Sequence, residues 1–169
     1  SWDEIVELSN EVQPFRSLIN PDDSVFLNPG NMPKAIQKYC KDTNQQIPLT
    51  KGEIARCIYD SLVLKYRYTI GQIESVTGKK IERLHIIGGG ANNKMMNQLT
   101  ANAIAIPVLA GPTEATAIGN IMMQAKAAGA VNSLTEIRDV VKNSFDVQRF
   151  EPSPKLDWDA AYARFEQLI

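Results

Sequence analysis

Residues 84–93 read LHIIGGGANN, an apolar run that ends in three consecutive glycines and two asparagines. The apolar residues predict a strand over 83–87, and the residues after the glycines predict a helix from Asn93 to Ile104. Glycines leave no Cβ at such a junction, so a flat ring or a phosphate can lie directly against the main chain. This stretch therefore indicates a nucleotide-binding turn between a strand and a helix.

A second strand is predicted over 106–109, and the turn AGPT at 110–113 leads from it into another helix. A strand, a crossover helix and a second strand form a right-handed unit in which the two strands are parallel. Ligands of open α/β sheets bind beyond the carboxyl ends of the strands. We therefore expect the turns at 88–93 and 110–113 to lie side by side at one edge of the sheet.

The spacing excludes two common nucleotide motifs. The dinucleotide fingerprint, started at Gly88, needs a glycine where Asn93 stands, and Ala110 and Gly111 replace the acidic residue expected after the second strand. The phosphate-binding loop that ends in Gly-Lys-Ser/Thr does not occur. Asn92 and Asn93 are left with two interpretations, which are capping of the following helix and hydrogen bonding to a base or ribose.

Composition limits the classes of partner. The 169 residues carry a formal net charge of −1, so there is no basic surplus for nucleic acid, and no apolar run reaches the ~20 residues of a membrane span. Cys40 and Cys57 are predicted to be buried free thiols of a cytoplasmic protein. The only histidine, His85, stands inside an apolar strand, which argues against a metal site.

The longest predicted helix begins at Thr50, which forms a capping box with Glu53, and ends near Gly78. Its expected buried stripe consists of Ile54, Ile58, Leu62, Tyr66, Ile70 and Ile73. Gly119, inside the helix that follows 110–113, indicates close packing or a ligand, and packing against the sheet is the favoured interpretation. Two strands are too few for an independently stable sheet, so we expect the remaining strands to lie outside this chain.

The stretch from Leu84 to Ile121 strongly resembles the nucleotide-binding part of the FGGY carbohydrate kinases. There, a strand, a glycine pair or triplet, a helix, a strand and a helix of the type found at 114–119 (EATAIG) form the adenosine side of an ATP cleft. Members of the family that phosphorylate L-rhamnulose are similar over further segments. These are INPDD at 19–23, LNP at 27–29, IARCIYDSL at 54–62 and AGPTEA at 110–115.

The resemblance implies an α/β fold, a ribonuclease H-like (actin/hexokinase-type) ATP-binding domain that here forms a helix-rich fragment with a small, partly parallel sheet. Residues 1–169 would be the later part of the C-terminal nucleotide-binding domain of a two-domain sugar kinase, without the N-terminal sugar-binding domain. The acceptor would be L-rhamnulose or a related ketose. The residues implied in ATP binding are Gly88, Gly89, Gly90, Ala91, Asn92 and Asn93.

The catalytic aspartate and the Mg²⁺ ligands of the family have no counterpart in this sequence, so no catalytic or metal-binding residue is assigned, and the chain alone is expected to be inactive. Three alternatives stay open. One is another sugar kinase of the family, such as a fuculokinase, a xylulokinase or a glycerol kinase. The second is an actin-like ATPase domain without a sugar acceptor. The third is a segment whose glycines only permit tight packing between strand and helix.

Overall fold

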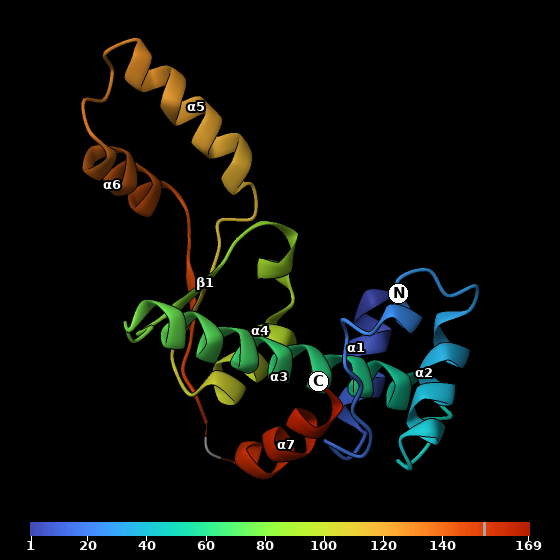
Figure 1. Ribbon diagram of the computed structural model, residues 1–169. Coiled ribbons are helices and arrows are strands. Elements are labelled where there is room, and N and C mark those ends of the chain that lie inside the picture. The colour runs from blue at the N-terminus through green and yellow to red at the C-terminus, as the bar shows by residue number, and fades with distance from the viewer. Residues whose placement is uncertain (154) are drawn as a thin grey trace.

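The computed structural model describes residues 1–153 and 155–169, which form a helix-rich α/β fold (Figure 1). One sheet contains β1 (Leu84–Ile86), β2 (Val108–Ala110) and β3 (Gln148–Phe150). The helices are α1 (Trp2–Asn10), α2 (Met32–Asp42), α3 (Lys51–Thr77), α4 (Lys94–Ile104), α5 (Ala115–Ala127), α6 (Leu134–Ser144) and α7 (Trp158–Phe165). Short 3-10 turns lie at Ser24–Phe26, Gly88–Asn92 and Glu166–Leu168.

The sheet confirms the predicted parallel pair and adds a strand to it. β1 pairs with β2 in parallel, with Leu84 opposite Val108, and α4 makes the crossover. β3 pairs with the other side of β2 in an antiparallel direction, with Phe150 opposite Val108. This third strand is not one of the two strands predicted from the sequence, because three residues are too few to show alternating polarity. Among the described residues, no strand pairs with the outer edge of β1.

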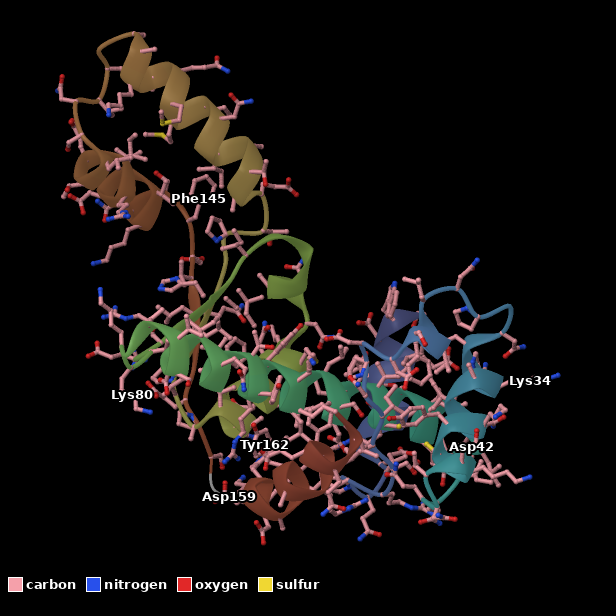
Figure 2. The ribbon with its side chains drawn as sticks, in the orientation of Figure 1. Lys34, Asp42, Lys80, Phe145, Asp159 and Tyr162 are labelled. Atoms are coloured by element: carbon pink, nitrogen blue, oxygen red, sulfur yellow. The ribbon has the colours of Figure 1, made fainter. Side chains whose placement is uncertain are left out.

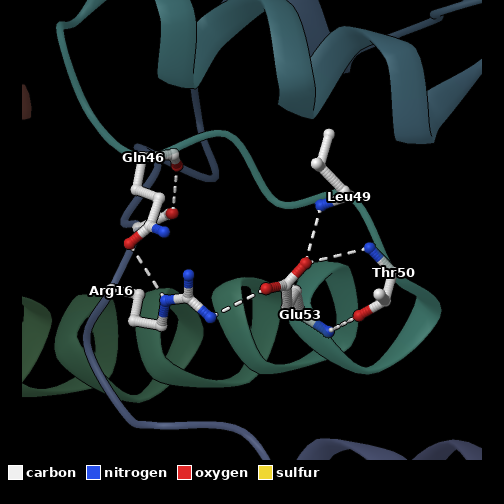
Figure 3. Close-up of polar contacts among 6 residues, drawn as sticks. Arg16, Gln46, Leu49, Thr50 and Glu53 are labelled. Carbon is white, nitrogen blue, oxygen red and sulfur yellow. Dashed lines mark hydrogen bonds and ion pairs between the residues drawn. The ribbon is translucent and has the colours of Figure 1, made fainter.

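Helix α3 runs through the middle of the fold (Figure 1), and a network at its start ties it to two loops (Figure 3). The predicted capping box is present. Thr50 Oγ1 accepts from the Glu53 N–H at 3.2 Å, and the Glu53 carboxylate accepts from the N–H groups of Thr50 (3.0 Å) and Leu49 (2.8 Å). Arg16 pairs with the other carboxylate oxygen at 2.8 Å. The N–H groups of Thr50 and Leu49, followed by Arg16, lower the pKa of Glu53.

The main core lies where α3, α4 and α7 meet. Its buried members are Leu18, Ala55, Tyr59, Val63, Leu64, Leu99, Ala103, Trp158, Ala161 and Phe165. A second cluster between α2 and α3 contains Ile19, Ile36, Cys40 and Cys57. Both cysteines are buried and free, as predicted. Among the described residues, no helix has both the length and the apolar composition that a membrane span requires.

The buried face of α3 differs from the predicted one. Of the expected stripe, Tyr66 and Ile73 are 39% and 46% exposed, whereas Arg56 and Asp60 are buried. Arg56 Nε donates to Asp60 at 2.9 Å, and the other Asp60 oxygen accepts from the Phe15 N–H at 2.7 Å. Charged groups can be buried when they are paired and hydrogen-bonded. A hydrophobicity pattern counts them as surface residues, and this shifted the predicted face.

Helices α5 and α6 project away from the rest of the fold (Figure 1), and neither contains a buried residue. The predicted packing of Gly119 against the sheet is therefore wrong, since a Cβ built at Gly119 would have no atom within 4 Å. Figure 2 shows Phe145 at the foot of this helix pair. Several large apolar side chains of this region are exposed, namely Ile121, Met123, Leu134, Val140, Phe145 and Val147.

Helix α1 approaches α3 very closely at Gly52. A Cβ at Gly52 would lie 2.5 Å from the carbonyl oxygen of Leu8, so any side chain there would push the two helices apart. Gly71 on the same helix is exposed and has no atom within 4 Å of its Cβ position. The two glycines of α3 are therefore a matched pair, one required by packing and one free of it.

We predict that Gly52→Ala and Gly71→Ala change stability in opposite directions. Gly52→Ala should lower the free energy of unfolding by about 1–3 kcal/mol, because the added methyl group collides with the backbone of α1. Gly71→Ala should raise it by about 0.5–1 kcal/mol, because alanine is the better helix former at an open position. Urea unfolding followed by circular dichroism measures both. Equal stability of the two variants would contradict the close approach of α1 and α3.

Candidate functional site

The glycine run forms a 3-10 turn, Gly88–Asn92, between β1 and α4. Gly88 has φ +74°, a left-handed conformation that favours glycine, and Asn93 N–H donates to the Gly90 carbonyl at 3.2 Å as the turn closes. Asn93 is the N-cap of α4, and its Oδ1 accepts from the Met96 N–H at 3.0 Å. The capping interpretation of Asn93 is therefore confirmed, and the N–H groups at the start of α4 lie directly behind the glycines.

The turns at 88–93 and 110–113 lie side by side, as expected from the parallel strands. The Gly88 N–H donates to the Pro112 carbonyl at 3.2 Å, and the Gly111 N–H donates to the Ile86 carbonyl at 2.8 Å. A side-chain contact joins the turns as well, since Thr113 Oγ1 donates to Asn92 Oδ1 at 3.1 Å. The turns that follow β1 and β2 therefore form one continuous surface at this edge of the sheet.

Tight packing does not account for Gly89 and Gly90. A Cβ at Gly89 would have no atom within 4 Å, and a Cβ at Gly90 would reach only Ile86 Cγ2, at an ordinary contact distance of 3.5 Å. Gly89 is also exposed. The space that a side chain would fill at Gly89 is therefore open, which is the condition for a ligand to approach the main chain.

An open groove of about 560 Å³ lies next to this turn. This volume falls in the range of small-molecule sites, roughly 300–1,000 Å³. One wall is α1, and the other is the glycine turn with the first residues of α4. The walls are in contact where Ser9 Oγ donates to Met95 Sδ at 3.4 Å. The residues that line the groove are Trp2, Asp3, Val6, Gly89, Asn92, Asn93, Lys94 and Met95.

The residues predicted to bind a nucleotide divide into two groups. Gly89, Asn92 and Asn93 line the groove. Gly88, Gly90 and Ala91 belong to the turn but are not among the residues that line the groove. Ala91 is buried, and its carbonyl accepts from Asn97 Nδ2 at 2.9 Å. The structure therefore brings half of the predicted set to the groove, and of the other half Ala91 is buried whereas Gly90 is exposed.

Sequence reasoning missed Trp2, Asp3 and Lys94. Trp2 is 80% exposed and stands across the groove from Gly89, a proximity that no local pattern could indicate. Lys94 follows directly after Asn93, at the positively polarised end of α4, so its position beside the glycines was a usable signal. Within the part of the chain that the structure describes, no group of three or more His, Cys, Asp and Glu residues could hold a metal ion.

Residues 1–128 match the model of the C-terminal domain of the FGGY family of carbohydrate kinases. The chain therefore belongs to this family. Curated rhamnulokinases are similar to it over its whole length. The enzyme of Bacteroides thetaiotaomicron is 44% identical and that of Bacillus subtilis 46% identical, each over 169 residues, which are 100% of this chain and 35% of the relative. The chain thus spans about a third of the length of the curated relatives it matches.

Solved structures of the same family share the fold. The crystal structure of xylulose kinase from Rhodospirillum rubrum has a TM-score of 0.65 at 17% identity and covers 99% of this chain and 33% of that protein. Plasmodium falciparum glycerol kinase with ADP has a TM-score of 0.66 at 14% identity, over 99% of this chain and 32% of that protein. The predicted fold class is therefore confirmed, and so is the resemblance to the FGGY carbohydrate kinases.

We predict that neighbouring glycines of the turn respond differently to alanine. Gly88→Ala should lower the free energy of unfolding by about 1–2 kcal/mol, because its left-handed backbone is strained for any residue with a Cβ. Gly89→Ala should change it by less than about 0.5 kcal/mol, because its Cβ would point into open space. Thermal and urea unfolding of the two variants test this difference. A large loss of stability in Gly89→Ala would mean that packing, and not ligand access, requires this glycine.

Proposed function

We propose that this chain is the nucleotide-binding portion of an ATP-dependent sugar kinase that transfers the γ-phosphate to the 1-hydroxyl of L-rhamnulose. In this proposal, residues 1–169 are the later part of the C-terminal domain, and the sugar-binding domain belongs to the rest of a longer protein. The observation that carries the substrate assignment is the 44–46% identity to rhamnulokinases along the entire chain. The predicted cytoplasmic location stays a prediction.

The chemistry of the groove suits ATP. The bare main chain at Gly89 offers a surface on which a ring or a phosphate can lie. Lys94 and the N-terminal end of α4 supply positive charge for phosphate oxygens. On the opposite wall, the exposed indole of Trp2 offers an apolar face for an aromatic base. The predicted set Gly88, Gly89, Gly90, Ala91, Asn92 and Asn93 is retained in this proposal.

The remaining parts of the reaction are proposed to reside elsewhere in the longer protein. As the resemblance to the family implies, the Mg²⁺ that accompanies ATP would be bound by groups outside this chain. Phosphoryl transfer depends on positioning and on neutralising charge around the transferred group from several sides. The chain alone supplies one wall of such a site. It should therefore bind ATP weakly and transfer no phosphate.

Two exposed surfaces support the proposal that this chain is part of a larger domain. Among the described residues no strand pairs with the outer edge of β1, and Ile87 beyond it is 59% exposed. Helix α5 has no buried residue, although Ile121 and Met123 are apolar. Apolar surface of this kind marks an interaction site in a stable protein. We propose that the preceding part of the domain covers it.

The deciding experiment is an ADP-release assay on the intact protein that contains this chain. It is given Mg-ATP and, separately, L-rhamnulose, L-fuculose, D-xylulose and glycerol. Release of ADP that depends on L-rhamnulose is the expected result. Release with another acceptor would correct the substrate and keep the kinase. Release without any acceptor would favour an actin-like ATPase, and no release would overturn the proposal.

We predict that Gly89→Val in the intact protein raises the KM for ATP about tenfold or more, because the branched side chain fills the space open to the nucleotide. The KM for the sugar should stay within about twofold, since no sugar contact is proposed here. Gly71→Val, the same change at an open position of α3, is the matched control and should leave both constants unchanged. An unchanged KM for ATP in folded Gly89→Val would remove this glycine from the site.

A further inference from the structure

We propose that Thr113 is a positioning residue of the nucleotide site, whose hydroxyl group holds the side-chain amide of Asn92 in the orientation that meets the ligand. This inference rests on the proposed binding of ATP beside the glycine turn. Thr113 lies on the turn after β2 and is not among the residues that line the groove, whereas Asn92 is. The Thr113 hydroxyl group reaches the groove lining through its hydrogen bond to Asn92.

The contact is specific to these two side chains. Thr113 Oγ1 donates to Asn92 Oδ1 at 3.1 Å, across 21 positions of sequence. Two backbone hydrogen bonds also hold the turns next to each other, from the Gly88 N–H to the Pro112 carbonyl and from the Gly111 N–H to the Ile86 carbonyl. The backbone therefore fixes the distance between the turns, and the hydroxyl group is left to fix the rotation of one amide.

Three asparagines near the glycine turn have different roles. Asn93 uses its Oδ1 to cap α4, and Asn97, which is buried, uses its Nδ2 to hold the Ala91 carbonyl. Asn92 is exposed, and only its Oδ1 has a partner within the part of the chain that the structure describes. Asn92 and Asn93 both line the groove, and Asn92 is the more exposed of the two. Asn92 is also the one whose amide is held by a side chain of the neighbouring turn.

The orientation of this amide determines what it can recognise. With its oxygen occupied by Thr113, Asn92 presents its Nδ2 hydrogens, so the matching ligand atom is a hydrogen-bond acceptor. A nucleotide offers such acceptors at its ribose oxygens, its ring nitrogens and its phosphate oxygens. An amide already held in place also loses less conformational freedom on binding than one that rotates freely in water. Thr113 would therefore strengthen binding without touching the nucleotide.

The test uses the intact protein and two variants of Thr113. Thr113→Val keeps the shape and removes the hydroxyl group, whereas Thr113→Ser keeps the hydroxyl group. Thr135→Val makes the same change on exposed helix α6, away from the turns, and is the matched control. Asn92→Ala, alone and combined with Thr113→Val, completes a double-mutant cycle. Calorimetric titration with ATP gives Kd, and steady-state assays give kcat and the two KM values.

Thr113→Val should raise the Kd and the KM for ATP about three- to tenfold, the range of one hydrogen bond. Thr113→Ser and Thr135→Val should stay within about twofold of the wild type, and kcat and the sugar KM should not change. Adding Thr113→Val to Asn92→Ala should cause no further loss. That last result separates positioning through Asn92 from a general structural effect, which would weaken binding in either background.

Two results would overturn the inference and leave the proposed function intact. One is a Thr113→Val protein that binds ATP as the wild type does. The other is an equal loss from Thr113→Val with and without Asn92. If the wild-type intact protein itself fails to bind ATP, the proposed function falls, and the role of Thr113 falls with it.

Discussion

The rest of the structure depends on the buried face of α3, because α1, α4 and α7 all pack against it. Tyr59, Val63 and Leu64 supply apolar surface to this core, and Gly52 lets the backbone of α1 come close. Helices α1 and α4 form the opposite walls of the groove. The packing of α3 therefore sets the distance between Trp2 and the glycine turn, although α3 itself contributes no residue to the groove.

A second constraint acts at the sheet. Parallel pairing of β1 with β2 brings the ends of both strands to the same edge, so their turns are in contact. The glycine turn thereby has support from behind, through Pro112 and Thr113, and open space in front, at Gly89. A site of this kind combines a rigid frame with bare backbone, and both properties favour close binding of a flat or charged ligand.

Local signals were the ones that sequence reasoning interpreted correctly. The capping box of Thr50 and Glu53 and the cap at Asn93 involve residues within one helical turn. Three features that sequence reasoning missed or misplaced depend on contacts between residues far apart in the chain. β3 was not recognised as a strand, and the face of α3 was shifted by the buried pair Arg56–Asp60. Gly119 was expected to pack against the sheet, although a Cβ there has no atom within 4 Å. Burial of a paired charge and exposure of an apolar helix both depend on neighbours that a local pattern does not contain.

By itself, the sequence determined the strand, glycine turn and helix at 84–104, the parallel crossover and the resemblance to the FGGY carbohydrate kinases, because each of these is encoded in consecutive residues. Only the tertiary structure decided that Trp2 and Asp3 line the same groove as Gly89 and that the Thr113 hydroxyl group donates to Asn92. These contacts join residues far apart in the chain. Their geometry follows from how α1, α3 and the two turns pack together, and packing is a property of the folded whole.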